Sequence, residues 1–215
     1  MELVGFSRSE FVDYLVRQID GHFPDGKGDT RAGLELDLDD ALARTERCID
    51  AAVMWRPGRF DPLHSEQNTV FLYYLANTIH RADHDRRLAT KVFYLNKALN
   101  GFSCFWDTEL PDVWFVGHSP GIVLARATYG SHFVVYQGCT VGKNHGDGPV
   151  IGEGVLMYPG SAIIGGGHIG DGTIVGQGQR IVNHDTPGHC YVFSDGAELQ
   201  LRTPKHDVLA EIFRR

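Results

Sequence analysis

The chain has 215 residues, 42% of them hydrophobic, which is enough for one domain or two small ones around a core. Its formal net charge of −7 argues against a nucleic-acid partner, and no stretch approaches eighteen consecutive apolar residues or has the layout of a signal peptide. We therefore expect a soluble, cytoplasmic protein without a membrane partner. The four cysteines form no CxxC pair, so reduced and mostly buried thiols are expected.

The first hundred residues have the spacing of helices. Ser7 and Glu10 have the spacing of a capping box ahead of an apolar periodic run, which predicts an N-terminal helix. Apolar residues at helical spacing predict a second helix (Leu38, Leu42, Ile49, Val53) and a fourth (Leu88, Val92, Leu95, Leu99). The segment 67–79, apolar nearly all round, predicts a third and largely buried helix between them.

Two further signals concern helix ends. The acidic stretch 35–40 (ELDLDD) predicts the N-terminus of the second helix, because the helix dipole favours carboxylates there. Asn100 and Gly101 form a pair that tolerates the left-handed conformation, so we expect the fourth helix to end there.

A strict period of six dominates the second half of the chain. Aliphatic residues recur at Ile151, Met157, Ile163, Ile169, Val175 and Ile181, and glycines follow three positions later at Gly154, Gly160, Gly166, Gly172 and Gly178. This period fits neither a helix face nor the alternation of a single strand, and it is typical of a parallel β-helix built from hexapeptides. The aliphatic side chains are expected to point into the coil, and the glycines to form its tight corners.

The period extends upstream through Val123, Tyr129, Val135 and Val141, and the next aliphatic residue in phase, Ile151, comes ten positions later. Ten is one hexapeptide plus four residues, so residues 142–149 are expected to leave the coil as an inserted loop. Loops that leave a regular scaffold often carry function.

The period stops after Val182. Residues 190–201 have the pattern of a hairpin around Asp195 and Gly196, and residues 204–215 that of a terminal amphipathic helix.

Residues 118–142 (HSPGIVLARATYGSHFVVYQGCTVG) and 149–178 (PVIGEGVLMYPGSAIIGGGHIGDGTIVGQG) together resemble the catalytic half of serine O-acetyltransferases. These enzymes are members of the left-handed β-helix hexapeptide acyltransferase superfamily. Residues 71–102 (FLYYLANTIHRADHDRRLATKVFYLNKALNGF) are similar to the helices that precede the β-helix in that family. The resemblance covers residues 60–190 and implies an α+β fold. We expect a helical domain over 1–105, a left-handed parallel β-helix over 106–185, and a hairpin and helix over 186–215.

The same resemblance implies an acetyl-CoA-dependent O-acetyltransferase, assembled as a homotrimer or as a hexamer of two trimers. Acetyl-CoA would lie as co-substrate in the groove between adjacent subunits, and no metal is required. The positions that match the family's CoA site are Gly142, Tyr158, Pro159, Gly176 and Gln177. Small or flat residues at such positions let the narrow pantetheine arm lie against the backbone.

The family's catalytic histidine lies in a motif of the form H-x-x-G-I-V, which this chain matches from His118 to Val123. Acyl transfer to a hydroxyl needs a base with a pKa near neutrality, and histidine meets this without heavy tuning. The family also has a carboxylate partner on the preceding coil. This chain is about four residues shorter there, so Asp107 and Glu109 both remain candidates.

On the acceptor side, the loop before the third helix falls near an acidic acceptor-binding residue of the family, which makes Asp61 and His64 candidates. Helix capping by His64 or Ser65 is the alternative reading of this loop. His145, in the inserted loop, is a further candidate contact.

The chain departs from the family in two places on the acceptor side. Gly117 stands where the family has an aspartate, and Gly148 falls near the position of a second acceptor-site histidine. These departures favour an acceptor other than free serine, but the sequence does not choose among serine, a serine-like amino acid, a sugar hydroxyl and a biosynthetic intermediate.

Two other functions remain open. One is a non-catalytic trimeric scaffold, which loss of the serine-site residues favours. The other is a zinc enzyme like the γ-class carbonic anhydrases, for which His184 and His189 are the only histidine pair with suitable spacing.

Overall fold

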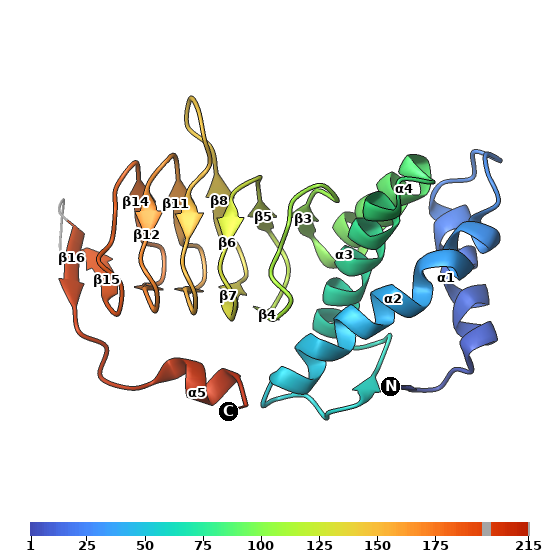
Figure 1. Ribbon diagram of the computed structural model, residues 1–215, viewed down its shortest axis with the longest axis horizontal. Coiled ribbons are helices and arrows are strands. Elements are labelled where there is room, and N and C mark those ends of the chain that lie inside the picture. The colour runs from blue at the N-terminus through green and yellow to red at the C-terminus, as the bar shows by residue number, and fades with distance from the viewer. Residues whose placement is uncertain (195–198, 215) are drawn as a thin grey trace.

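The computed structural model describes residues 1–194 and 199–214. A helical N-terminal half stands at one end of a parallel β-solenoid, and a short C-terminal segment returns along the coils toward the helices (Figure 1). The predicted fold class is therefore confirmed. Within the described residues, no helix is long and apolar enough to cross a membrane.

The four predicted helices of the N-terminal half are all present. Their bounds are α1 (Arg8–His22), α2 (Thr30–Ala51), α3 (Ser65–Ala82) and α4 (Arg86–Asn100), and a two-stranded parallel sheet pairs β1 (Glu2–Leu3) with β2 (Arg59–Phe60). The capping box at Ser7 and Glu10 is present in full. Gly101 ends α4 in the left-handed conformation, with φ +65°, as predicted.

The predicted start of the second helix is wrong. α2 begins at Thr30, where the Asp29 side chain accepts a hydrogen bond from the Ala32 backbone N–H, and residues 35–40 lie inside the helix. Leu34 and Leu38 are buried there, so the apolar spacing already runs through the acidic stretch. At the other end, Val53 lies beyond α2 and is exposed.

α3 is the central element of the helical half. Every residue from Gln67 to Ile79 is buried, as predicted, because α2, α4 and the first coil pack around the helix. Each buried polar side chain of α3 makes at least one hydrogen bond: Asn77 Nδ2 donates to the carbonyl of Trp106 (2.8 Å), and Asn68 Oδ1 accepts from Asn100 (3.0 Å). Pairing of this kind offsets the cost of taking amides out of water.

The strands of the solenoid are short and form three sheets. Their bounds are β3 (Phe102–Cys104), β4 (Trp114–Gly117), β5 (Ile122–Leu124), β6 (Thr128–Tyr129), β7 (Phe133–Tyr136), β8 (Thr140–Gly142), β9 (Val150–Ile151), β10 (Leu156–Met157), β11 (Ala162–Ile164), β12 (His168–Ile169), β13 (Ile174–Val175), β14 (Arg180–Val182) and β15 (Tyr191–Ser194). The first sheet has the order β3-β5-β8-β11-β14, the second β4-β7-β10-β13-β15, and the third β6-β9-β12, all with parallel pairs.

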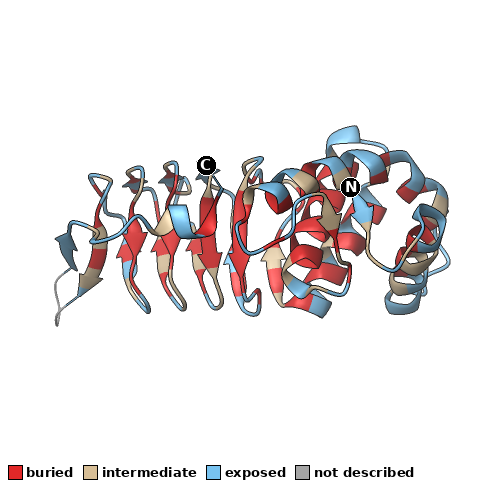
Figure 2. Ribbon diagram, turned by 90° about the horizontal axis from the view of Figure 1, so that it is seen from below, coloured by how far each residue is buried: buried red, intermediate tan, exposed pale blue. Residues whose placement is uncertain are grey.

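The six-residue period sets the register of the coils. Ile151 pairs with Ile169, Met157 with Val175, and Ile163 with Ile181, each pair eighteen positions apart. All six side chains are buried. Figure 2 shows the strands of the coils mostly in the colour of buried residues. Three hexapeptides therefore complete one coil, and the repeat stacks like residues into a continuous core.

Most of the predicted corner glycines adopt the left-handed conformation. Gly154, Gly160, Gly172 and Gly178 have φ between +63° and +70°. At the corner that follows β11, however, Gly165 rather than Gly166 takes the positive φ.

The upstream extension of the period fails at its first residue. Val123 was predicted to point inward, but it is 43% exposed, and its neighbours Ile122 and Leu124 are buried. Leu124 pairs with Val141, so Leu124 is the residue in phase with the later coils. The predicted inserted loop is present between β8 and β9 and projects from the coils in Figure 1.

The coil continues past the predicted stop at Val182. Thr186 forms a bridge to Ile169, and β15 pairs in parallel with β13, so a less regular coil follows. β15 then forms the predicted hairpin with the antiparallel β16 (Leu199–Arg202). Its turn, predicted around Asp195 and Gly196, lies outside the described residues.

The C-terminal segment ties the coils back to the helical half. The predicted terminal helix is shortened to α5 (Val208–Ile212), which lies over a cleft of about 790 Å³ against the second sheet. Beyond α5, the Arg214 backbone N–H donates to the carbonyl of Ala51 (2.7 Å). The Arg214 guanidinium donates to the carbonyls of Asp50, Ala52, Val53 and Trp55. Arg214 thus caps the C-terminus of α2, where backbone carbonyls lack helical partners.

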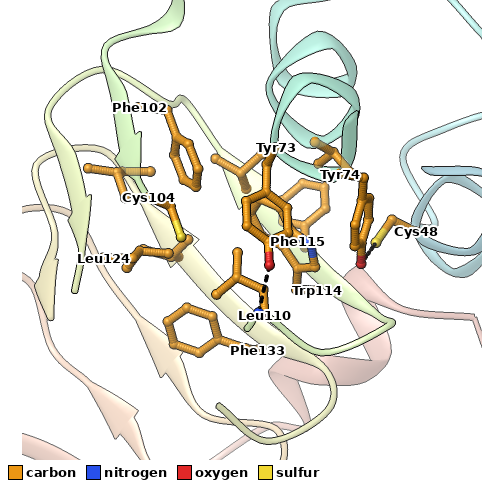
Figure 3. Close-up of a cluster of buried hydrophobic side chains, with 14 of the residues drawn as sticks. Cys48, Tyr73, Tyr74, Phe102, Cys104, Leu110, Trp114, Phe115, Leu124 and Phe133 are labelled. Atoms are coloured by element: carbon orange, nitrogen blue, oxygen red, sulfur yellow. Dashed lines mark hydrogen bonds between the residues drawn. The ribbon is translucent and has the colours of Figure 1, made fainter. Parts of the chain in front are cut away.

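An aromatic cluster joins the two halves of the protein (Figure 3). Tyr73 of α3 packs edge-on against Trp114 of β4, at 5.7 Å between ring centroids, and Phe102 of β3 stacks on the same Trp114 ring. All four cysteines are buried and free, as predicted.

Two glycine-to-alanine substitutions separate backbone strain from steric overlap. Gly160 has φ +70° and open space around its Cβ position, so Gly160→Ala is expected to cost about 1 kcal/mol. A Cβ on Gly130 would lie 2.4 Å from the backbone of Gly152 on the next coil, so Gly130→Ala is expected to cost about 3 kcal/mol or more. Urea unfolding of both variants measures the difference, and equal losses would contradict the predicted stacking of the coils.

Candidate active site

The turn that carries His118 is longer than its equivalents on later coils. Gly117 pairs with Tyr136, and Gly121 lies over Gly138, whose N–H donates to the carbonyl of Pro120 (3.1 Å). Gly117 and Gly121 are therefore four positions apart, whereas their counterparts on the next coil, Tyr136 and Gly138, are two apart. His118 and Ser119 are the two extra residues, and they bulge from the edge of the solenoid between the second and first sheets.

His118 holds an unusual backbone conformation at this bulge. Its φ is +58°, in the left-handed region that costs a non-glycine residue about 1–2 kcal/mol, and its side chain is 76% exposed. The surrounding turn is fixed: the Ser119 hydroxyl donates to the carbonyl of Asn100 (2.8 Å), and the Gly121 N–H donates to that of Gly101 (3.0 Å). Strain maintained by its surroundings is frequent at functional positions.

Glu66 is the carboxylate that the structure places beside His118. Its Oε1 lies 3.7 Å from His118 Nδ1, and its side chain is 19% exposed. Glu66 stands in the first turn of α3, where the helix dipole favours a negative charge. The distance is slightly longer than a hydrogen bond, as is common for catalytic pairs without bound substrate. Glu66 was not among the candidates predicted from the sequence, although its neighbours His64 and Ser65 were.

His64 serves as the N-cap of α3, which the capping alternative predicted. Its Nδ1 accepts from the backbone N–H of Gln67 (3.5 Å) and lies 3.3 Å from Glu66 Oε2. As a cap acceptor, Nδ1 carries no proton to donate to Glu66. Trp55 packs edge-on against His64 (5.9 Å between ring centroids) and at a tilt against Phe115 (5.1 Å), which makes the site apolar on that side.

The two predicted carboxylate partners of His118 are engaged elsewhere in the chain. Asp107 pairs with Arg126, and Glu109 pairs with Arg81 and accepts from Asn77 (3.3 Å). Although burial opposes the shift, the hydrogen bonds from Arg81 and Asn77 lower the pKa of Glu109. No contact joins either carboxylate to His118 in the described part of the chain.

Four of the five predicted CoA positions lie along the same edge of the solenoid as His118. Tyr158 and Pro159 form the turn after β10, and Gly176 and Gln177 form the turn after β13. Through the strand register, these turns stack on the turn of Gly117 and His118. The edge is lined by an aromatic pair, because the rings of Tyr136 and Tyr158 stack at 5.8 Å.

Three other predicted residues lie away from this edge or have structural partners. Gly142 ends β8 and His145 stands in the inserted loop, so both belong to the edge between the first and third sheets. Asp61 accepts from the N–H of Leu63 (2.9 Å) in the loop before α3, and its own N–H donates to Gln67 Oε1 (2.8 Å). For the zinc alternative, His184 and His189 lie at two different corners of the last coil.

Gly117 has a steric reason to lack a side chain. A Cβ at this position would lie 2.5 Å from the ring of Tyr136 on the next coil. Tyr136 therefore covers the backbone next to His118, in the space that a side chain at position 117 would need.

The site thus belongs to a protein with a helical N-terminal half and a hexapeptide β-solenoid, with a histidine on one solenoid edge and a carboxylate from the helices facing it. Solved structures of serine acetyltransferases have this fold. Isoform 3 from Entamoeba histolytica, in complex with cysteine, aligns over 94% of this chain and 75% of its own, with TM-score 0.64 and 17% identity. The Vibrio cholerae enzyme aligns over 82% and 72%, with TM-score 0.67 and 18% identity. The soybean enzyme complexed with serine aligns over 79% and 73%, with TM-score 0.62 and 20% identity.

At such identities these likenesses show the fold alone. No family model matches the chain, and no curated protein matches it in sequence. The fold that the sequence resemblance implied is confirmed.

The strain at His118 is measurable. Because glycine adopts a positive φ at no steric cost, His118→Gly is expected to be about 1 kcal/mol more stable than His118→Ala. Urea unfolding of the two variants, which lack the imidazole equally, measures the difference. A less stable glycine variant would show that the left-handed conformation is not held in solution.

Proposed function

We propose that this protein is an acetyl-CoA-dependent O-acetyltransferase with His118 as the general base. The observation that supports the proposal is the arrangement of residues along the solenoid edge that carries His118. A strained histidine with a carboxylate beside it stands in line with the turns of Tyr158–Pro159 and Gly176–Gln177, where the sequence resemblance puts acetyl-CoA. The fold shared with serine acetyltransferases supports the same reaction class.

In the proposed reaction, His118 removes the proton from the acceptor hydroxyl as the oxygen attacks the thioester carbonyl of acetyl-CoA. This attack forms the new C–O bond and the tetrahedral intermediate. When the intermediate collapses, the C–S bond breaks and the imidazolium returns its proton to the departing CoA thiolate. No covalent enzyme intermediate is needed. A positioned base of this kind contributes on the order of a hundred- to ten-thousand-fold to the rate.

Glu66 is assigned the role that the sequence left open between Asp107 and Glu109. Its carboxylate faces His118 Nδ1, which leaves Nε2 for the acceptor, and a negative charge there stabilises the imidazolium that forms in the transition state. Its position in the first turn of α3 fixes where the carboxylate lies relative to the solenoid. The oxyanion requires further donors, most simply backbone N–H groups of the glycine-containing turns.

The acceptor is proposed to differ from free serine. Tyr136 covers Gly117, so no carboxylate projects from this position toward the acceptor. The apolar wall of Trp55 and Phe115 beside His64 favours an acceptor with a partly apolar body, and Asp61 remains a candidate polar contact.

We further propose that the chain acts as a trimer, alone or paired into a hexamer. The 76% exposure of His118 in a single chain is consistent with a site that a neighbouring copy completes. Val123, Val150 and Val182 are exposed on the outside of the coils, where burial between copies would remove them from water.

The first experiment incubates the purified protein with acetyl-CoA and a panel of L-serine, related hydroxy-amino acids and sugars, and detects products by mass spectrometry. His118→Ala is expected to lower turnover by two or more orders of magnitude while the variant still binds CoA. His132→Ala is the matched control, because His132 also has φ +58° and a carboxylate, Glu153, at 3.6 Å, but lies on a different edge.

Each outcome of this experiment leads to a different conclusion about the acceptor or the mechanism. Acetylated serine alone would mean that other residues replace the missing serine-site groups, and a different product would move the protein to another pathway. Wild-type turnover in His118→Ala would contradict the role of His118 as general base. Absence of CoA binding would favour the non-catalytic scaffold.

A second experiment identifies the carboxylate. Glu66→Gln keeps the size of the side chain and removes its charge, so kcat is expected to fall about tenfold or more with little change in KM for acetyl-CoA. Glu109→Gln and Asp107→Asn serve as comparisons and are expected to retain activity. If either of these lowers kcat more than Glu66→Gln does, the assignment of Glu66 is wrong.

A further inference from the structure

A groove of about 520 Å³ lies in the helical half, between α2 and α3. Its polar and charged lining residues are Asp37, Asp40, Arg44 and Arg47 from α2, Thr78 and Arg81 from α3, and Asp112 from the segment before β4. Three arginines therefore line one groove. The proposed acetyl transfer involves these two helices only at the N-terminus of α3, where Glu66 lies.

Arg44 is the unusual member of this set. Arg44 is only 9% exposed, yet it is one of the residues that line the groove. Its Nη1 donates to Thr78 Oγ1 (2.9 Å) and its guanidinium lies over the Tyr74 ring at 4.4 Å, but Nε and Nη2 are buried without a hydrogen-bond partner in the described residues. No carboxylate within residues 1–194 and 199–214 forms an ion pair with it. A buried charge without an opposite charge is costly, and such groups are usually paired.

The other two arginines are held only by half-exposed ion pairs. Arg47 pairs with Asp112 (2.9 Å) and Arg81 with Glu109, and both arginine side chains are about half exposed, at 55% and 51%. Ion pairs at this exposure are weak, so either guanidinium can leave its partner for a stronger one. Burial and the nearby positive charge of Arg81 together lower the pKa of Arg44, which shows that the two guanidinium groups repel each other across the groove.

Acidic residues lie at both ends of the groove. Asp37 is held by His84 at 2.8 Å, and Asp40 lies in the same stretch of α2. Asp112 lies at the other end, where it pairs with Arg47, and Glu109 pairs there with Arg81. The end formed by Arg44, Arg47 and Arg81 therefore attracts an anion when Arg47 and Arg81 turn from these carboxylates toward it.

We propose that the α2–α3 groove binds a small molecule through a compact oxyanion, a phosphate or carboxylate group, held by Arg44 with Arg47 and Arg81. Guanidinium groups match the planar, bidentate geometry of such oxyanions. The oxyanion supplies the opposite charge that Arg44 lacks and removes the repulsion between Arg44 and Arg81. The site is separate from the edge of His118, so the proposal does not depend on the proposed acetyl transfer.

The test uses inorganic phosphate and malonate as probes on the full chain, at an ionic strength held constant with sodium chloride. Isothermal titration and thermal unfolding are expected to show saturable binding and a rise in Tm that chloride does not give. Arg44→Met, which keeps the unbranched aliphatic part of the side chain and removes the guanidinium, is expected to weaken binding tenfold or more. Tighter binding of phosphate or of malonate identifies which oxyanion the natural ligand carries.

Arg47→Gln and Arg81→Gln guard against loss of folding in Arg44→Met, because both side chains are half exposed and each substitution is expected to weaken binding about fivefold. Arg87→Met is the control, since Arg87 pairs with Asp25 (2.6 Å) outside the groove, and it is expected to bind both probes like the wild type. Absence of saturable binding would overturn the proposal. Binding that the arginine substitutions in the groove leave unchanged would overturn it equally.

Discussion

The packing of α3 against the first coil is the contact on which the rest of the structure depends. Tyr73 lies at its centre: the hydroxyl donates to the carbonyl of Thr108 (2.9 Å) and accepts from the N–H of Leu110 (2.8 Å), while the ring packs on Trp114. This one side chain satisfies two backbone groups that would otherwise be buried unpaired, at a cost of about 1–3 kcal/mol each. Because α3 cannot rotate or slide without losing these bonds, its first turn is fixed against the solenoid, and Glu66 is fixed opposite His118.

The repeat was readable from the sequence because it depends on local spacing alone. A hexapeptide places its aliphatic residue and its corner glycine by geometry within a few residues, so Ile151 to Ile181 were assigned in register. The period fails where the chain changes the length of a turn. Leu124 and Tyr129 are five positions apart rather than six, so counting back from Val141 in sixes reaches the exposed Val123 instead of the buried Leu124. Upstream of Leu124 the chain departs from the repeat again, because the turn that carries His118 is two residues longer than its counterpart on the next coil.

The partner of that base was not readable in the same way. Glu66 and His118 are 52 positions apart and meet only because a helix packs on a coil, which no local pattern records. Asp107 and Glu109 are closer to His118 in sequence, but they form ion pairs with Arg126 and Arg81 instead. Gly117 shows the same limit. Its lack of a side chain read as a missing acceptor contact, and only the stacking of the coils reveals that the ring of Tyr136 takes the space.

The clamp of Arg214 on the end of α2 has a consequence for the order in which the protein folds. Its hydrogen bonds join residues 159 to 164 positions apart, and contacts of such long range form only after the chain between them has become ordered. The coils must stack before the C-terminal segment has a surface to follow back to the helices. The carbonyls at the end of α2 therefore gain their cap only after the solenoid is complete, although α2 precedes the whole solenoid in the sequence.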